Sequence, residues 1–371
     1  MMSRHGRRVL LAALASVLAA TGALYGTGPD RATAAPARPA TDAAAATPFP
    51  ALGFQVNLDS QSSTDRRRVL ADLAAMGATW VREGVAWHLV QPNPGALSTT
   101  ALAPVDSLVT DAAAAGLRVM LTADDTAPAW ATTGTAQDLS NNYGDFTGRL
   151  AAHFLGKGPS GSSPAYELMN EPNGGGAGST TAGTQSNAQV EPQSTKPDDT
   201  PTDYAHAACA ANTAIHAADS AATVVAGAIG ADLPWMTWAQ TSLQAGLAQC
   251  FDVLSMHSYS GTSPLPELRT MAADAGRPNA TIWLTEFGAT TCTEANVGCV
   301  SEAQQSTIIL DNLNKLQQNY PWVPVAMVYQ ACDLVGASTP REAAFGVYRS
   351  TTSTRCSAPK AVVAAITDLY H

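Results

Sequence analysis

The sequence predicts a single (β/α)8 barrel, a TIM barrel of the α/β class. From residue 49 onward, eight short apolar runs alternate with helical runs, and this alternation is typical of a closed parallel sheet covered by helices. Most of the runs are continuously apolar, as expected for strands that helices cover. An open doubly wound sheet is the alternative, but no glycine-rich phosphate turn follows the first run.

The elements follow in order along the chain. Thr64 is expected to cap the first helix and Gly77 to end it, because a hydroxyl accepts from free amides and glycine adopts the left-handed conformation. Gly116 ends the second helix in the same way. We expect strands at 52–58, 80–86, 118–123, 166–170, 223–229, 251–257, 282–287 and 325–329. The helices are expected at 64–76, 104–115, 142–155, 202–219, 235–249, 265–275, 302–319 and 359–370.

One segment interrupts this alternation. Residues 173–201 are rich in Gly, Ser, Thr, Gln and Pro and have no apolar period. Loops of this length are uncommon and are either functional or disordered. Because the segment follows the fourth strand, we expect it at the active rim of the barrel.

The first 34 residues have the features of a secretory signal peptide. Basic residues, among them Arg7 and Arg8, precede the almost wholly apolar stretch 9–18, and 32–34 offer small residues for cleavage. A membrane anchor is the alternative, but the apolar stretch is short for a span. We therefore predict a secreted, extracellular protein without stable membrane insertion once the signal is removed.

The mature chain is expected to be one domain. Residues 35–48, rich in Ala and Pro, are predicted to form a flexible linker, which leaves 49–371 for the barrel. The net charge of the whole chain is −10, and removal of the signal makes it more negative. Nothing resembles a basic stripe for a phosphate backbone, so nucleic acid is not an expected partner. We expect a monomer.

Six cysteines behind a signal peptide predict three disulfide bonds. Many connectivities are possible, and free buried thiols are the alternative. A zinc site is less favoured, because the sequence has no CxxC pair. The pairing that we expect is Cys209–Cys250, Cys292–Cys299 and Cys332–Cys356.

Two glutamates stand where a barrel carries its chemistry. Glu171 closes the fourth predicted strand within Asn-Glu-Pro, and Glu286 closes the seventh. Catalytic groups of such barrels project from the carboxyl ends of the strands. Glycoside hydrolysis uses one carboxyl group to protonate the leaving oxygen and another to attack carbon or to activate water. An ion pair with a nearby arginine is the alternative for each residue alone.

Several motifs agree with this interpretation. The chain resembles the clan A glycoside hydrolases, particularly families five and thirty-nine, and the resemblance covers most of the mature sequence. The two glutamate motifs are the specific ones. The similar segments are "WVREGVAW" with "VQPNPGAL", "GLRVMLTADDTAPAW", "YELMNEPN", "DVLSMHSYS", "IWLTEFGAT" and the closing "AFGVYRS" with "APKAVVAAI".

The resemblance implies a retaining mechanism. No metal or other cofactor is expected, because the histidines show no ligand spacing. Glu171 would be the general acid and base, and Glu286 would form the covalent glycosyl-enzyme. Asn170 would bind the sugar 2-hydroxyl. His257 and Tyr259 match a His-x-Tyr motif of the sixth strand, in which the tyrosine hydroxyl donates to the nucleophile. For His257, a core histidine with satisfied hydrogen bonds is the alternative.

An arginine near one glutamate would help to keep that carboxyl charged. Arg82 on the second strand is the candidate, and a structural salt bridge with Glu167 is the alternative. The sequence departs from the clan at the eighth strand, where many members carry a tryptophan under the sugar. Here Val328 or Tyr329 stands near that place, and Tyr329 is either a sugar platform or a buried structural residue.

Three tryptophans are candidates for sugar platforms at the rim, with packing between helices and barrel as the alternative. They are Trp87, Trp130 and Trp235. The expected partner is therefore a carbohydrate, and the expected activity is hydrolysis of a β-linked oligo- or polysaccharide. A transglycosylase that uses the same site and a non-catalytic carbohydrate-binding barrel are the alternatives. The sequence leaves open the sugar, the linkage, and endo or exo action.

Overall fold

The computed structural model describes residues 48–174, 197, 200–293, 298–351 and 356–371. The chain divides between Ala46 and Thr47, and the description below concerns the unit Thr47–His371. The predicted signal peptide and nearly all of the predicted linker lie outside the described residues, as does most of the segment 173–201.

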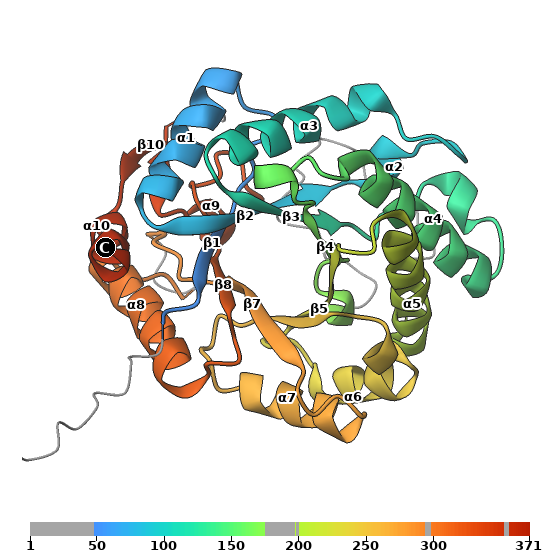
Figure 1. The fold of residues 1–371 in the computed structure, drawn as a ribbon. Coiled ribbons are helices and arrows are strands. Elements are labelled where there is room, and N and C mark those ends of the chain that lie inside the picture. The colour runs from blue at the N-terminus through green and yellow to red at the C-terminus, as the bar shows by residue number, and fades with distance from the viewer. Residues whose placement is uncertain (1–47, 175–196, 198–199, 294–297, 352–355) are drawn as a thin grey trace, which may run out of the picture. The chain divides into compact units, whose positions relative to one another are not determined.

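Eight parallel strands close into a barrel in which each strand pairs with the next and β8 pairs with β1 (Figure 1). This confirms the predicted TIM barrel. The strands are β1 (Ala51–Gln55), β2 (Ala78–Val85), β3 (Arg118–Ala123), β4 (Ala165–Leu168), β5 (Thr223–Gly230), β6 (Val253–His257), β7 (Thr281–Phe287) and β8 (Val325–Val328).

A ring of helices surrounds the barrel in Figure 1. Its members are α1 (Ser63–Ala75), α3 (Thr99–Ala114), α4 (Ala136–Phe154), α5 (Pro201–Ala218), α6 (Met236–Gln244), α7 (Leu265–Asp274), α8 (Glu302–Asn319) and α10 (Ala361–Tyr370). Smaller elements that the sequence did not predict are α2 (Trp87–Val90), α9 (Pro340–Ala343) and the antiparallel pair β9 (Tyr348–Ser350) and β10 (Cys356–Pro359). Single 3-10 turns include Ala129–Thr132 and Pro172–Gly174.

Several predicted helix starts are wrong. Ser62, not Thr64, caps α1, because its side chain accepts from the Asp65 amide. The second predicted helix begins at Thr99 rather than 104, since Ser98 caps it and Pro104 is tolerated inside it. The third begins at Ala136 instead of 142, where Thr135 forms a capping box. Helix α6 ends at Gln244, before Gly246, whose φ of 116° is left-handed.

The barrel interior is apolar at its amino end and polar above it. One small core cluster draws its residues from seven of the eight strands, with Trp80 and Trp283 in edge contact at 5.1 Å. Side chains of a strand alternate between its two faces. Arg82, two residues after Trp80, therefore enters the same interior, one layer nearer the carboxyl ends. The cluster comprises Trp80, Met120, Ala165, Val225, Val253, Trp283, Val325 and Met327.

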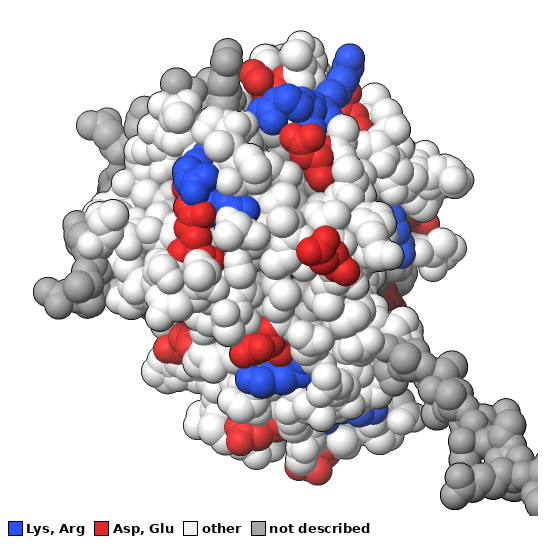
Figure 2. Space-filling model, turned by 90° about the vertical axis from the view of Figure 1, so that its left-hand side faces the viewer, with Lys and Arg blue, Asp and Glu red and all other residues white. Residues whose placement is uncertain are grey.

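All three predicted disulfides are confirmed. Cys209–Cys250, Cys292–Cys299 and Cys332–Cys356 are bonded, with Cα atoms 4.8, 5.1 and 5.2 Å apart. Within the described part of the chain, no helix has the length and apolar character of a membrane span. Figure 2 shows one face, on which acidic and basic side chains lie in small groups, some of them mixed and some acidic alone, separated by uncharged surface.

Candidate active site

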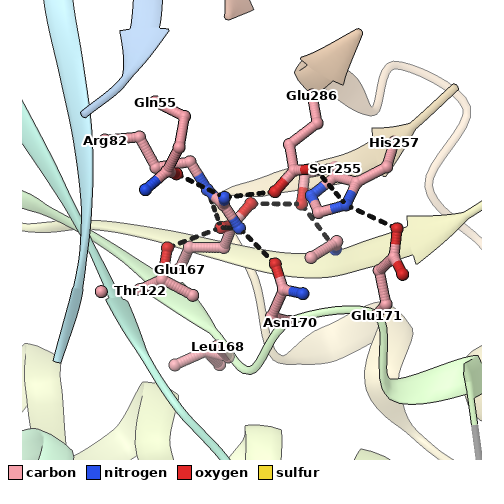
Figure 3. Close-up of polar contacts among 12 residues, drawn as sticks. Gln55, Arg82, Thr122, Glu167, Leu168, Asn170, Glu171, Ser255, His257 and Glu286 are labelled. Carbon is pink, nitrogen blue, oxygen red and sulfur yellow. Dashed lines mark hydrogen bonds and ion pairs between the residues drawn. The ribbon is translucent and has the colours of Figure 1, made fainter. Parts of the chain in front are cut away.

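Glu171 and Glu286 meet at the carboxyl ends of the barrel strands (Figure 3). Glu286 belongs to β7, and Glu171 lies three residues beyond the end of β4. One carboxylate oxygen of each, together with a ring nitrogen of His257, lies within 4.8 Å of the others. The Glu171 side chain is 28% exposed and that of Glu286 is 9% exposed. Glu171 therefore faces the mouth of the site, whereas Glu286 lies deeper.

The backbone that carries Glu171 is strained. Met169 and Glu171 have φ values of 65° and 47°, in the left-handed region that non-glycine residues rarely adopt. Each such residue costs roughly 1–3 kcal/mol, so neighbouring contacts have to hold it. The Glu171 amide donates to the Ala228 carbonyl at 3.1 Å. This backbone bond fixes the turn against β5.

Asn173 fastens the same turn, a role that sequence reasoning missed. Its side chain donates to the Gly230 carbonyl at 2.9 Å and accepts from the Gly230 amide at 2.8 Å. A Cβ atom on Gly230 would lie 3.2 Å from the Glu171 carboxyl carbon, so the close approach favours glycine. Strain, amide pairing and close packing together orient Glu171 toward the barrel axis.

Two donors hold the Glu286 carboxylate. Arg82 Nη1 donates to one oxygen at 2.5 Å, and the Tyr259 hydroxyl donates to the other at 2.6 Å. Burial and the negative charge of Glu286 raise the pKa of Tyr259 well above its ordinary value, so the phenol keeps its proton and remains a donor. The hydrogen bond from Tyr259 to Glu286 that the resemblance implies is thus present, and Arg82, expected near one of the two glutamates, lies against Glu286.

Arg82 also makes the salt bridge that was its alternative role. Its side chain contacts Glu167 at 2.7 Å, and Nη2 donates to Asn170 Oδ1 at 2.6 Å. Burial opposes a charge on Arg82, but Glu167 and Glu286 outweigh it and raise the pKa of the guanidinium. Burial likewise opposes a charge on Glu167. The positive charge of Arg82 and, to a smaller extent, that of His257 outweigh this effect and lower the pKa of the Glu167 carboxyl. The structure therefore places Arg82 and Glu167 as a buried ion pair beneath the site.

His257 bridges the two glutamates. Its Nδ1 lies 3.1 Å from Glu171 Oε1 and 3.5 Å from Glu286 Oε2. Burial and Arg82 oppose a charge on His257, but Glu286 and the hydrogen-bonded Glu171 outweigh them and raise its pKa. For Glu171, burial acts to raise the pKa, and the hydrogen bond and charge of His257 reverse this into a net lowering. Both shifts favour a protonated His257 beside an ionised Glu171.

Burial contradicts the prediction that Trp87 is a sugar platform. Trp87 is fully buried, stacks on Phe146, and donates its indole N–H to Gln91 at 2.8 Å, so it has no free face for a sugar. Trp130 packs edge-on against Trp87 but keeps part of its surface exposed, so its platform role stays a prediction. Trp235 is 8% exposed at the start of α6.

Tyr329 is the second aromatic whose surroundings argue against a platform. It is 2% exposed, and its ring packs edge-on against Tyr259 and Phe345. Almost none of its ring face is open, so this structure does not support stacking of a sugar on it. The ring instead forms a wall beside the tyrosine that holds Glu286.

Further residues around the site carried no sequence motif. Arg341 and Glu342 of α9 form an ion pair of 3.0 Å. The charge of Arg341 contributes to the lowered pKa of Glu171, and burial, together with the negative charges of Glu286 and Glu171, raises the pKa of Glu342. Gln55 accepts from Arg82 Nη1 at 2.7 Å. Gln55 is the last residue of β1, and Arg341 and Glu342 lie on the short helix α9 that follows β8. Neither place has a sequence pattern that points to a site. The group Glu171, His257 and Glu286 is also the set of side chains, among those described, with the spacing of metal ligands.

Comparison with known proteins identifies the family of this chain. Residues 43–323 match the family described as cellulase (glycosyl hydrolase family 5). No curated protein matches the sequence significantly.

Solved glycoside hydrolases share the fold. A family 5 subfamily 18 enzyme from Streptomyces cattleya, in complex with Manβ1-4GlcNAc, has a TM-score of 0.63 and 17% identity over 86% of this chain and 80% of its own. A family 39 enzyme from Bacteroides cellulosilyticus has a TM-score of 0.63 and 16% identity over 87% of this chain, which covers 64% of that enzyme.

An exo-β-1,4-mannosidase from an Opitutaceae bacterium has a TM-score of 0.59 and 16% identity, covering 87% of this chain and 59% of that one. At such identities the likeness shows the fold alone. The family match, by contrast, spans most of the sequence and includes both glutamate strands. With its closed eight-stranded barrel and a glutamate at the carboxyl end of β4 and of β7, the chain is a glycoside hydrolase and belongs to glycosyl hydrolase family 5.

Proposed function

We propose that the protein is a retaining β-glycosidase that works by double displacement. The observation that carries this is the approach of Glu171 and Glu286, whose carboxylate oxygens come within 4.8 Å. Retaining enzymes hold their carboxyl groups about 5–5.5 Å apart, whereas inverting enzymes need roughly 6.5–9.5 Å to admit a water molecule. The short spacing leaves room for a sugar carbon against one carboxylate and favours direct attack.

The two glutamates have different environments, and these support different roles for them. Glu286 is held by Arg82 and Tyr259, which aim a charged oxygen at the anomeric carbon. It attacks that carbon while Glu171, on the exposed side, protonates the departing oxygen. The bond to the leaving group breaks and an ester to Glu286 forms. Glu171 then removes a proton from water, which attacks the same carbon and releases Glu286.

Asn170 is proposed to bind the sugar 2-hydroxyl. Arg82 occupies its Oδ1 at 2.6 Å, which fixes the amide orientation and leaves the Nδ2 donors for a ligand. A hydrogen bond to this hydroxyl strengthens as charge develops at the neighbouring carbon. The arginine therefore positions the nucleophile and the sugar-binding amide at the same time.

The acid step needs a proton, and we propose that the pair of His257 and Glu171 supplies it. Because Nδ1 lies 3.1 Å from Glu171 Oε1, the two residues act as one titrating pair. Approach of the leaving oxygen draws the proton through Glu171, and His257 becomes neutral. His257 is thus proposed as a positioning residue that stores the proton.

We expect kcat/KM to fall as pH rises through the raised pKa of His257, above the ordinary value of 6.5. The pair carries its catalytic proton below that pH and loses it above. In His257→Asn the alkaline limb should move to lower pH, because the pair of His257 and Glu171 loses its proton at a higher pH than Glu171 alone would. A pH–rate profile of both proteins measures this. An alkaline limb at the same pH in both proteins would contradict the role of His257.

Stereochemistry tests the mechanism directly. Proton NMR during hydrolysis of an aryl β-glycoside should show the β-anomer of the free sugar first, with the α-anomer appearing only by mutarotation. Initial release of the α-anomer would overturn the retaining mechanism. Product analysis at high acceptor concentration separates hydrolysis from transglycosylation, in which a sugar replaces water at the same site.

The proposed substrate is a β-linked oligo- or polysaccharide of neutral sugars, met outside the cell. Among the described residues, the two guanidinium groups near the acids are already engaged. Arg82 contacts Glu167, Glu286, Asn170 and Gln55, and Arg341 pairs with Glu342 at 3.0 Å, so both have little capacity left for a sugar carboxylate. Export is inferred from the signal-like residues 1–34. Two of the structural neighbours, one bound to Manβ1-4GlcNAc and one an exo-β-1,4-mannosidase, make β-mannosides the first substrates to screen.

A further inference from the structure

A chain of three side-chain amides leads from Arg82 to the rim of the barrel. Arg82 Nη1 donates to Gln55 Oε1 at 2.7 Å, and Gln55 Nε2 donates to Asn57 Oδ1 at 3.3 Å. Asn57 Nδ2 then donates to Gln330 Oε1 at 2.8 Å. Gln55 and Gln330 are 3% and 1% exposed, and Asn57 is partly exposed. The mechanism proposed above uses none of these amides.

The cation at one end fixes the direction of every amide. An arginine only donates, so Gln55 has to present its oxygen to Arg82 and its nitrogen to Asn57. Asn57 in turn accepts through its oxygen from Gln55 and donates through its nitrogen to the oxygen of Gln330. Within the described part of the chain, the Gln330 amide nitrogen has no hydrogen-bond partner although it is buried. A buried donor without an acceptor is costly, which indicates that an acceptor belongs there.

The amides lie opposite the proposed acid. Asn57 follows the end of β1 by two residues, and Gln330 follows the end of β8 by two, so they flank the seam between these strands. Glu171 lies at the seam between β4 and β5, where its amide bonds to Ala228. In a closed barrel of eight strands these two seams face each other across the mouth. A leaving group at Glu171 therefore directs the rest of the bound sugar toward Asn57 and Gln330.

We propose that Asn57 and Gln330, held in place by Gln55, form a glycone subsite that binds hydroxyl groups remote from the scissile bond. The inference rests on the proposed function and deepens it. The amides offer uncharged N–H donors, which suit the lone pairs of neutral sugar hydroxyls. Recognition by directed amides would also take over part of the positioning that a tryptophan on the eighth strand supplies in other clan members, where this chain has Val328 or Tyr329.

The test combines two variants with deoxy sugars. Asn57→Ala removes the central amide, and Gln330→Met removes the terminal one while keeping its volume. Gln137→Ala, an exposed amide on α4, is the control. The substrates are 4-nitrophenyl β-glycosides of the configuration preferred by the wild type, together with their 3-, 4- and 6-deoxy analogues. kcat/KM is measured for every combination.

Each variant should lower kcat/KM on the parent glycoside roughly 10- to 100-fold, the scale of a lost hydrogen bond to a buried donor. On the deoxy sugar that lacks the contacted hydroxyl, wild type and variant should be nearly equal. Both variants should keep the pH profile of the wild type, because Arg82 and Glu286 remain in place. The control should match the wild type throughout.

Two outcomes would overturn the subsite. One is an equal loss on the parent and on every deoxy analogue, which would make the amides structural supports. The other is no loss at all. A wild type that cleaves none of the glycosides would instead refute the proposed function. The subsite would then be tested by saturation-transfer NMR, which measures binding of the matching methyl glycosides and their deoxy analogues to the wild type and the variants. A loss of binding in the variants for the parent sugar alone would support the subsite, and an equal loss for all sugars, or no loss, would overturn it.

Discussion

Replacing Glu286 with alanine is expected to lower kcat on an aryl β-glycoside by roughly 10⁵-fold or more, the scale on which removal of a covalent nucleophile acts. The variant should still fold. Arg82 keeps its buried partner Glu167 at 2.7 Å, so no cation is left unpaired. Circular dichroism and steady-state kinetics check the two halves of this expectation. Glu267→Ala on α7, an exposed carboxylate, should retain full activity.

Azide sharpens the assignment of the nucleophile. In Glu286→Ala, the truncated side chain leaves space on the attacking side of the anomeric carbon. Azide entering there should attack that carbon, expel the aryloxide with its electron pair, and form an α-glycosyl azide in one displacement. Near-normal activity of the variant without azide, or a β-glycosyl azide as product, would mean that another residue is the nucleophile.

Replacing Glu171 with alanine should have the second largest effect, and that effect should depend on the leaving group. On a natural glycan, whose leaving alcohol needs a proton, kcat/KM should fall roughly 10²- to 10⁴-fold. On a glycoside with an activated phenol the first step should be nearly normal, because the phenoxide leaves without help. The glycosyl-enzyme should then accumulate, since no base activates water, and a burst of phenol should appear before a slow steady state.

Azide distinguishes the two glutamates by product. In Glu171→Ala, Glu286 still forms the ester, so azide attacks the intermediate from the opposite face and should yield a β-glycosyl azide. Mass spectrometry of the trapped enzyme should locate the sugar on the peptide that contains Glu286. An equal loss on natural and activated substrates would count against Glu171 as the acid and base.

Much of this molecule was predictable from the order of its residues. A strand that is buried on both faces is a continuous apolar run in the sequence, and a helix is bounded by capping residues and glycines. The eight strands and their alternation with helices could therefore be predicted. The two glutamates were readable because a carboxylate at the end of a buried strand has no packing purpose. Helix starts were less certain, since Ser62 and Thr64 are both good caps and only the backbone path selects Ser62.

Whether an aromatic residue can act as a sugar platform depends on its exposure, and no local sequence pattern predicts that exposure. Trp87 and Trp130 both follow barrel strands, yet the first is fully buried and the second is not. The difference comes from α4, whose Phe146 and Tyr143 pack against Trp87. Such contacts join segments far apart in the chain, so the sequence offered packing and sugar binding as equal alternatives.

By itself, the sequence determined the barrel and the disulfide-forming cysteines, and it singled out the two glutamates as candidate acids, because each depends on local pattern or on a short motif. Only the tertiary structure decided what surrounds those acids. The approach of their oxygens within 4.8 Å, the strained turn under Glu171, and the amide chain to Gln330 all join different strands. Closure of the sheet brings residues from β1 to β8 to one end, and their distances follow from strand register and stagger.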